Sequence, residues 1–254
     1  KRRTWIQSMH YAPNKTSTPP ICEHSLHIWT LHLPKLRKKL PEYTLALSQE
    51  ERKKVTRFKA TNDQISYTLV RGGLRFILQK YLDTPANKLD LSVNLYGKPK
   101  IKATVSSTLQ FNLSHSGDYA IYAITKNSPV GVDIEKIRIR SPEYLERLAY
   151  RFFSKNESKL IANTPETEIT QLFFSLWTKK EAYTKQHGFG LHLPLSSFNV
   201  NISLPSQPSV VNTVVNRFSL PISQACDLPS PKGYCAAYSI AATKKLKVEH
   251  FNKS

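Results

Sequence analysis

Acidic residues, cysteines and long apolar runs are scarce in this sequence. Asp and Glu number 18 against 37 Lys and Arg, so the 254-residue chain carries a formal net charge of +19 at pH 7. The three cysteines form no C-x-x-C pair, which argues against a zinc or disulfide framework and indicates a reducing compartment. The longest apolar stretch, Tyr234 to Ala242, is much shorter than the roughly 20 residues of a membrane-spanning helix. We therefore expect a cytoplasmic protein with no membrane segment.

Several signatures of well-known enzyme and nucleic-acid-binding classes are also missing. No Walker A loop, G-x-G-x-x-G or G-x-S-x-G motif occurs, which argues against P-loop NTPases, dinucleotide-binding enzymes and α/β-hydrolases. No C₂H₂, RNP-like or homeodomain pattern is present either. The positive charge favours anionic partners, and composition leaves nucleic acid, an anionic membrane, a phosphorylated small molecule and an acidic protein all open.

The two halves of the chain share a pattern. Ser48 with Glu51, and Ser154 with Glu157, each form an S-x-x-E capping box, which predicts a helix start. In each half the short helix precedes a long amphipathic helix and then strands. Hydrophobic residues make up 40% of the chain, enough for a real core. The pattern indicates an α+β protein with an internal duplication.

The expected elements fall into two lobes. Helices are predicted over 48–58, 63–82, from 141, from 154 and over 164–186, and strands over 27–33, 91–95, 109–114, 119–125, 130–137 and beyond 198. The boundary is expected at Asn127-Ser128-Pro129, which gives an N-terminal lobe of residues 1–128 and a C-terminal lobe of residues 129–254.

The run Gly131-Val132-Asp133-Ile134-Glu135 places two acids on one face of a predicted strand. Residues two apart share a face, so Asp133 and Glu135 point one way and Val132 and Ile134 point into a core. Neighbouring carboxylates repel each other unless a cation lies between them, and Mg²⁺ takes oxygen ligands of this kind. The alternative is an exposed strand with solvated acids. The apolar partners favour a buried strand, where unpaired carboxylates are costly.

A second group of candidate residues lies on the predicted helix that ends near Gly188. Trp177, Glu181 and Lys185 recur every four residues and share one face of that helix. The alternative is an ordinary surface Glu–Lys pair. Because Trp is mostly buried, its presence on the same face indicates that the pair lies beside a cleft.

These two runs together resemble the 4′-phosphopantetheinyl transferase superfamily. G-V-D-I-E, followed later by W-x-x-K-E-A-x-x-K-x-x-G, is similar to that family's paired motifs. The segments Tyr96–Pro99 and Phe111–Gly117 are similar to its G-K-P and F-N-[IL]-S-H-S segments, and the match extends over about residues 45–195. The length and duplicated layout look like the surfactin-synthetase type. The resemblance implies two similar α+β lobes in a pseudo-two-fold arrangement, with the active site at the lobe interface.

The resemblance also implies a site for coenzyme A and Mg²⁺. The implied Mg²⁺ ligands are Asp133, Glu135 and Glu181. The implied coenzyme A contacts are Lys54, Arg71, Lys98, Ser114, His115 and Lys185, with Lys98 close to the adenosine end. Glu51 departs from the pattern, because some relatives have Lys there, and Lys53 or Arg57 could then compensate at the 3′-phosphate.

The implied reaction transfers 4′-phosphopantetheine from coenzyme A to a serine of an acyl or peptidyl carrier protein and releases 3′,5′-ADP. Lys185 would be a fixed cation at the phosphates, and Glu181 would accept the serine proton directly or through a metal-bound water. His115 is the alternative proton acceptor.

The expected partners follow from the resemblance and the charge. Carrier proteins are usually acidic, so a basic enzyme surface would attract them, and the two lobes of one chain would replace a dimer and leave a monomer. No nucleic-acid or membrane partner is expected. The alternative functions are a nucleic-acid-binding protein, supported mainly by the charge, and a metal-dependent phosphodiesterase that uses the same three carboxylates.

Overall fold

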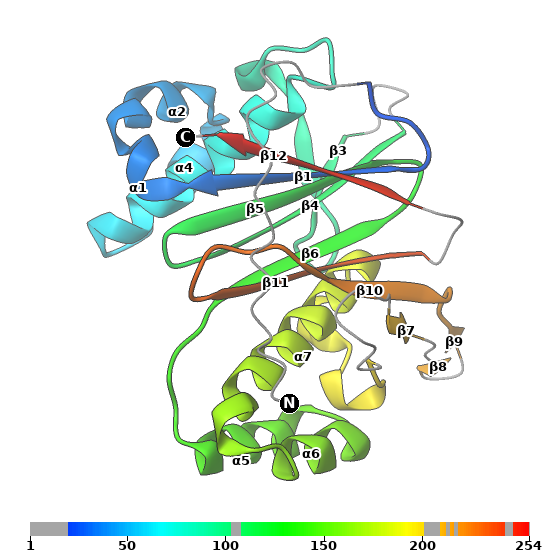
Figure 1. Cartoon of the computed structure of the whole chain (residues 1–254). Coiled ribbons are helices and arrows are strands. Elements are labelled where there is room, and N and C mark those ends of the chain that lie inside the picture. Colours follow the sequence, from blue (N-terminus) through cyan, green and yellow to red (C-terminus); the bar gives the residue numbers. More distant parts are fainter. Residues whose placement is uncertain are drawn as a thin grey trace.

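Two four-stranded sheets pack against each other, and helices cover the outer face of each (Figure 1). The computed structural model describes residues 20–102, 108–200, 209–211, 214–215, 218–241 and 246–253. The core between the sheets draws on both of them, with Ile28 and Ile121 from the first and Val132 and Ala236 from the second. The predicted α+β class is confirmed.

The first lobe runs from one strand through a set of helices to a β-hairpin. Its elements are β1 (Ser25–His32), α1 (Leu33–Leu36), η1 (Arg37–Lys39), α2 (Leu40–Ala46), α3 (Gln49–Val55), α4 (Thr61–Leu78), η2 (Ala86–Lys88), β2 (Leu91–Val93), β3 (Pro99–Ile101), β4 (Leu109–Ser116) and β5 (Tyr119–Lys126). The predicted capping box starts α3: Glu51 N–H donates to Ser48 Oγ, and Ser48 N–H donates to the Glu51 carboxylate. Leu69 and Leu74 of α4 are buried against the first sheet.

The second lobe repeats this plan. Its elements are β6 (Val130–Lys136), α5 (Pro142–Phe152), α6 (Lys155–Ala162), α7 (Glu166–His187), η3 (Gly190–His192), η4 (Leu195–Ser197), β7 (Ser209–Val211), β8 (Val214–Val215), β9 (Phe218–Ser219), β10 (Ser223–Leu228) and β11 (Tyr234–Ala241). Ser141 caps α5, and the predicted box of Ser154 with Glu157 starts α6. Gly188 ends α7 in the left-handed conformation, with φ of 72°, which glycine adopts without strain.

Strand order supports the internal duplication. The first sheet contains the order β1-β5-β4 and the second the order β6-β11-β10, with every neighbouring pair antiparallel. In both lobes the helices lie between the first strand and the hairpin. The long helices α4 and α7 therefore occupy equivalent positions on the outer faces of the two sheets (Figure 1).

The last described strand lies in the first sheet. β12 (Lys247–Lys253) pairs in parallel with β1, and Phe251 stacks on Trp29 with ring centroids 4.7 Å apart. The division at 128/129 had assigned all later residues to the second lobe, so it needs this correction. The strands expected beyond residue 198 are present in part, while 201–208 lie outside the described residues.

Within the described part of the chain, every helix is too short or too polar to cross a bilayer.

Candidate active site

A glycine lets β6 and α7 approach closely. A Cβ atom on Gly131 would collide with the Ala182 carbonyl oxygen and the Gln186 backbone nitrogen of α7. The side chains of β6 alternate as predicted: Val132 and Ile134 lie in the core between the sheets, and Asp133 and Glu135 point the other way. The two acidic residues of β6 therefore face the helix that carries Glu181 and Lys185.

Asp133 is the most buried acid of this group, with 2% of its surface exposed. Its Oδ1 accepts hydrogen bonds from Lys185 Nζ at 2.6 Å and from Ser114 Oγ at 2.7 Å. Its Oδ2 is buried and has no hydrogen-bond partner among the described residues. A buried carboxylate oxygen without a partner is costly, so this atom is suited to a cation.

The pKa values of the other two acids show that negative charge is crowded here. Burial, and then the neighbouring Asp133 carboxylate, raise the pKa of Glu135. Burial raises the pKa of Glu181 as well; Lys185 opposes this effect, and Asp133 and Glu135 add to it. The three predicted metal ligands thus lie within electrostatic reach of one another.

The donor set fits a hard divalent cation, because Mg²⁺ binds carboxylate oxygens and usually keeps several waters and a phosphate as further ligands. Among the described residues, however, no three His, Cys, Asp or Glu side chains already stand close enough to enclose a metal. A Mg²⁺ ion at these carboxylates would need further ligands such as water and phosphate.

The edge strand β4 of the first lobe completes this group. Ser116 Oγ donates to Glu135 at 2.8 Å, and Lys185 Nζ also donates to Ser114 Oγ at 2.9 Å. The His115 side chain reaches solvent, yet partial burial and then the Lys185 ammonium lower its pKa, so it is neutral near pH 7. Side chains of β4, β6 and α7 therefore contact one another here.

Two predicted phosphate contacts lie on the first-lobe helices. Arg71 of α4 pairs with Glu51 at 2.7 Å, and Lys54 is exposed with its ammonium 5.4 Å from the Tyr67 ring centroid. Burial acts to raise the pKa of Glu51, but Arg71, the hydrogen bond from the Ser48 N–H and Arg75 together outweigh it and hold that pKa below its usual value. Glu51 thus caps α3 and holds both arginines, which explains an acid at this position.

Lys98 lies between the lobes. Its Nζ donates to the Val130 carbonyl at 3.0 Å and to the Gln186 carbonyl at 2.9 Å. Burial lowers its pKa to about 8. Because both acceptors are backbone carbonyls, the Lys98 ammonium points at the backbone of β6 and α7 and not at the carboxylates.

Sequence reasoning missed a buried ion pair beside the site. Lys180 is completely buried, pairs with Glu157 at 2.7 Å, and donates to the carbonyls of Leu195 and Phe198. Glu157 was recognised only as a capping residue, and Lys180 only as part of the K-E-A run. The sequence signal that could have revealed the pair is Lys180 itself, a charged residue among apolar positions of the predicted helix. The pair holds the loop after α7 against α6.

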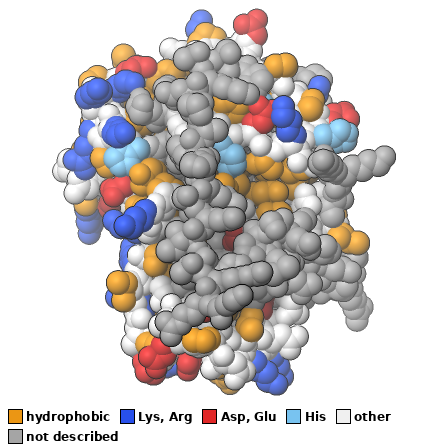
Figure 2. Space-filling model, viewed as in Figure 1, with side chains coloured by type: hydrophobic (Ala, Val, Ile, Leu, Met, Phe, Trp, Pro, Cys, Tyr) orange, Lys and Arg blue, Asp and Glu red, His pale blue; other side chains and the backbone are white. Residues whose placement is uncertain are grey.

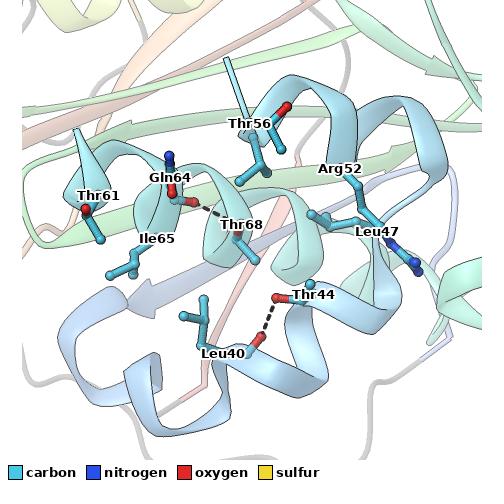
Figure 3. A pocket seen from close by; sticks show the side chains of 10 residues that line it. Leu40, Thr44, Leu47, Arg52, Thr56, Thr61, Gln64, Ile65 and Thr68 are labelled. Carbon is cyan, nitrogen blue, oxygen red and sulfur yellow. Dashed lines mark hydrogen bonds between the residues drawn. The ribbon is translucent and has the colours of Figure 1, made fainter. Parts of the chain in front are cut away.

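A cavity of about 410 Å³ lies apart from these residues, among α2, α3 and α4 (Figure 3). Its lining residues are Leu40, Thr44, Leu47, Arg52, Val55, Thr56, Thr61, Gln64, Ile65 and Thr68. The hydroxyls of Thr44, Thr56 and Thr68 donate to carbonyls of their own helices, so the lining is largely apolar. No predicted site residue lines it.

Comparisons with known proteins agree with this geometry. Residues 129–239 match the family described as the 4′-phosphopantetheinyl transferase superfamily, and residues 35–127 match the family described as 4′-phosphopantetheinyl transferase, N-terminal. The chain is 31% identical to the 4′-phosphopantetheinyl transferase HetI of Nostoc sp. over 213 residues, which cover 84% of this chain and 85% of that protein. It is 36% identical to the 4′-phosphopantetheinyl transferase Sfp of Bacillus subtilis over 164 residues, which cover 65% and 70%.

A solved holo-(acyl-carrier-protein) synthase from Bacillus anthracis also matches. It covers 45% of this chain and 96% of its own, with 19% identity and a TM-score of 0.37. The family matches together span both lobes, and the HetI match covers most of each chain. The chain therefore belongs to the 4′-phosphopantetheinyl transferase superfamily, as an enzyme of the surfactin-synthetase type.

Proposed function

We propose that this enzyme moves the 4′-phosphopantetheine arm of coenzyme A onto the acceptor serine of an apo acyl or peptidyl carrier protein, with Mg²⁺ and with release of 3′,5′-ADP. The observation that carries the proposal is the group formed by Asp133, Glu135, Glu181 and Lys185. It places three carboxylates and one fixed cation where strand β6 meets helix α7, beside the first-lobe strand β4. Such a site suits a metal-bound diphosphate.

The proposal of a metal rests on the negative charge of three carboxylates, which the surrounding side chains do not fully neutralise. Asp133 Oδ2 has no hydrogen-bond partner among the described residues, and Glu135 and Glu181 have raised pKa values. In the proposal these three side chains hold Mg²⁺. The ion would offset the negative charge that develops on the bridging oxygen, which leaves with the α-phosphate.

The phosphate contacts come from both lobes. Lys185 and Ser114 would bind the pyrophosphate, because both already lie beside Asp133. His115 would donate to a phosphate oxygen from the same strand. Lys54 and Arg71 on the first-lobe helices would meet the 3′-phosphate, although Arg71 must then share its guanidinium with Glu51. Lys98 is not assigned a phosphate contact in this proposal, since its ammonium already donates hydrogen bonds to two carbonyls.

The reaction is a substitution at phosphorus. The serine oxygen forms a bond to the β-phosphorus of coenzyme A while the bond from that phosphorus to the bridging oxygen breaks. The serine proton goes to Glu181, directly or through a water. Burial raises the pKa of Glu181 in the metal-free protein, whereas a bound Mg²⁺ would lower it, which favours proton transfer through a water. His115, neutral near pH 7, is the alternative acceptor. Lys185 stabilises the charge that develops on the departing α-phosphate as 3′,5′-ADP leaves.

The carrier would meet a basic surface around the start of α5. Ile139, before α5, is 90% exposed, and Tyr150, near the end of α5, is 84% exposed, so apolar side chains reach the solvent at both ends of this segment. Arg140 and Arg147 lie 5.8 and 6.0 Å from the Tyr144 ring centroid. In the sequence this segment directly follows β6, which carries Glu135. An acidic carrier suits this combination of apolar and positive groups.

The oligomeric state and location are part of the same proposal. Two lobes of one chain supply all the proposed side chains, so we propose a monomer that acts in the cytoplasm.

Transfer is tested by incubating the protein with coenzyme A, Mg²⁺ and an apo carrier domain and then measuring the mass of the carrier. The expected result is a gain of one phosphopantetheine, absent with a carrier whose acceptor serine is alanine and absent with Glu181→Gln. No gain on any of several carrier domains, or cleavage of nucleic acid instead, would overturn the proposal.

A further inference from the structure

The turn between β2 and β3 of the first lobe binds the end of α7 in the second lobe. Asn94 Nδ2 donates to the Gly188 carbonyl at 3.0 Å. The Tyr96 ring packs against Phe189 and His192, with centroid distances of 5.7 and 4.9 Å. Lys98 then donates to carbonyls of α7 and β6. One short turn thus touches both elements that carry the active-site acids.

The turn is held rigid before it reaches the second lobe. Asn94 Oδ1 accepts hydrogen bonds from the backbone N–H groups of Tyr96 and Lys98. Asn94 N–H donates to the Lys98 carbonyl, and Gly97 takes a positive φ of 85°. An asparagine side chain that bonds its own turn in this way fixes the backbone locally. The side chain of Lys98 therefore starts from a defined position.

A cation is well placed where Lys98 ends. The last four carbonyls of a helix have no partner within the helix, and its C-terminus carries partial negative charge. Gln186 belongs to this last turn of α7, one residue after Lys185. The other acceptor, Val130, begins β6, three residues before Asp133. The Lys98 ammonium thus links the start of β6, which carries Asp133, to the end of α7, which carries Lys185.

We propose that Lys98 is a positioning residue for the transfer reaction: its ammonium ties the end of α7 to the start of β6 and so sets Glu181 and Lys185 relative to Asp133 and Glu135. The catalytic consequence rests on the proposed function, whereas the tie rests on the hydrogen bonds alone. Two of the three N–H groups of Lys98 are already used by these carbonyls, so a single N–H remains for any other acceptor.

The test compares Lys98→Met, which keeps the apolar stem, with Lys98→Arg and with Lys100→Met, an exposed lysine of the same hairpin. For Lys98→Met we expect kcat to fall at least about tenfold, within the roughly hundredfold that a misplacement of about 1 Å can cost, while KM for coenzyme A changes less than about threefold. Lys98→Arg should recover most of kcat, and Lys100→Met should match the wild type.

A rise in KM for coenzyme A with unchanged kcat would overturn the proposal in favour of direct nucleotide contact. Wild-type kinetics in Lys98→Met would overturn it too. If Lys98→Met does not fold, Asn94→Ala, which releases Gly188, is compared with the wild type in the same assay, and unchanged kcat counts against the proposal.

Amide hydrogen exchange of residues 183–188 separates this inference from the proposed function. Faster exchange in Lys98→Met than in Lys100→Met is expected even if the protein transfers nothing. Equal exchange in both variants shows that the tie does not hold α7. Absence of transfer by the wild-type protein with normal exchange counts against the function alone.

Discussion

Lys185 Nζ lies 2.6 Å from Asp133 Oδ1, so the cation of α7 and the buried acid of β6 form an ion pair across the candidate site. The pair is asymmetric, since 2% of the Asp133 side chain but 27% of the Lys185 side chain is exposed. The exposed part of the Lys185 side chain can therefore contact a diphosphate while the lysine stays paired with Asp133, which would hold the metal.

Asp133→Asn should abolish most transfer and keep the fold. The amide still accepts at Oδ1 from Ser114 and Lys185, but it no longer supplies a charge to the metal. We expect the transfer rate to fall by more than about a hundredfold, the scale of losing one electrostatic stabiliser. The control is Asp118→Asn, an exposed acid 3.7 Å from Lys136, which should stay within about twofold of the wild type. A fully active Asp133→Asn would remove the metal argument.

Metal binding should be visible in thermal stability and should depend on pH. The pKa values of Glu135 and Glu181 are raised above 4.5 in the fold, so the folded protein binds these protons more tightly than the unfolded chain. The metal-free protein therefore loses this part of its stability as pH rises from about 4.5 through the raised values. Mg²⁺ should restore it at neutral pH, by about 2.7 kcal/mol at a hundredfold excess over Kd.

Scanning calorimetry with and without Mg²⁺ checks this expectation. Well below pH 4.5, where these carboxyls are protonated, the ion should leave Tm unchanged. Glu181→Gln should show a smaller decrease in metal-free stability with pH than the wild type, and a smaller Mg²⁺ effect. An equal rise in Tm with Mg²⁺ in wild type and variant would place the ion elsewhere.

Local sequence patterns predicted those features of the fold whose interacting residues lie only a few positions apart. The capping boxes at Ser48 and Ser154 and the glycine end of α7 at Gly188 were predicted because their partners lie at most four positions away. The alternation of β6 was likewise readable, since side-chain direction repeats every two residues. The motif residues came from family resemblance, which supplied roles that spacing alone left open.

Contacts between distant segments were not predictable in this way. The pairing of β12 with β1 joins the two ends of the described chain, and nothing in the local pattern of either strand names the other. Glu51 was expected to be an anomaly near the 3′-phosphate, yet it holds Arg71 and Arg75, which lie 20 and 24 positions later. The resemblance implied a coenzyme A contact for Lys98, and nothing in its local sequence indicates its two acceptors, which are backbone carbonyls of β6 and α7 in the other lobe.

Breaking the buried pair of Lys180 and Glu157 should cost much more stability than breaking an exposed pair. Lys180→Met leaves the Glu157 charge buried without its partner, which typically costs about 3–5 kcal/mol. Lys102→Met removes an exposed pair with Asp90, in which both side chains are more than half exposed, and should cost under about 1 kcal/mol. Urea denaturation measures both. The double variant Lys180→Met/Glu157→Gln should recover part of the loss, and equal costs for the two single variants would contradict the burial argument.

Capture of an acidic carrier should depend on salt and on the arginines of α5. Basic groups gather on the exposed surface, with Lys and Arg side chains visible over the first-lobe helices (Figure 2) and with Arg140 and Arg147 beside Tyr144. Charges in solvent are screened over about 10 Å at 0.1 M salt, so raising salt should raise KM for the carrier. Arg147→Gln should raise that KM at low salt and flatten its salt dependence, while KM for coenzyme A stays unchanged.

The matched control is Lys35→Gln, which removes the charge of an exposed lysine on the first-lobe helix α1. An equal effect of both substitutions would show that net charge, and not the α5 surface, attracts the carrier.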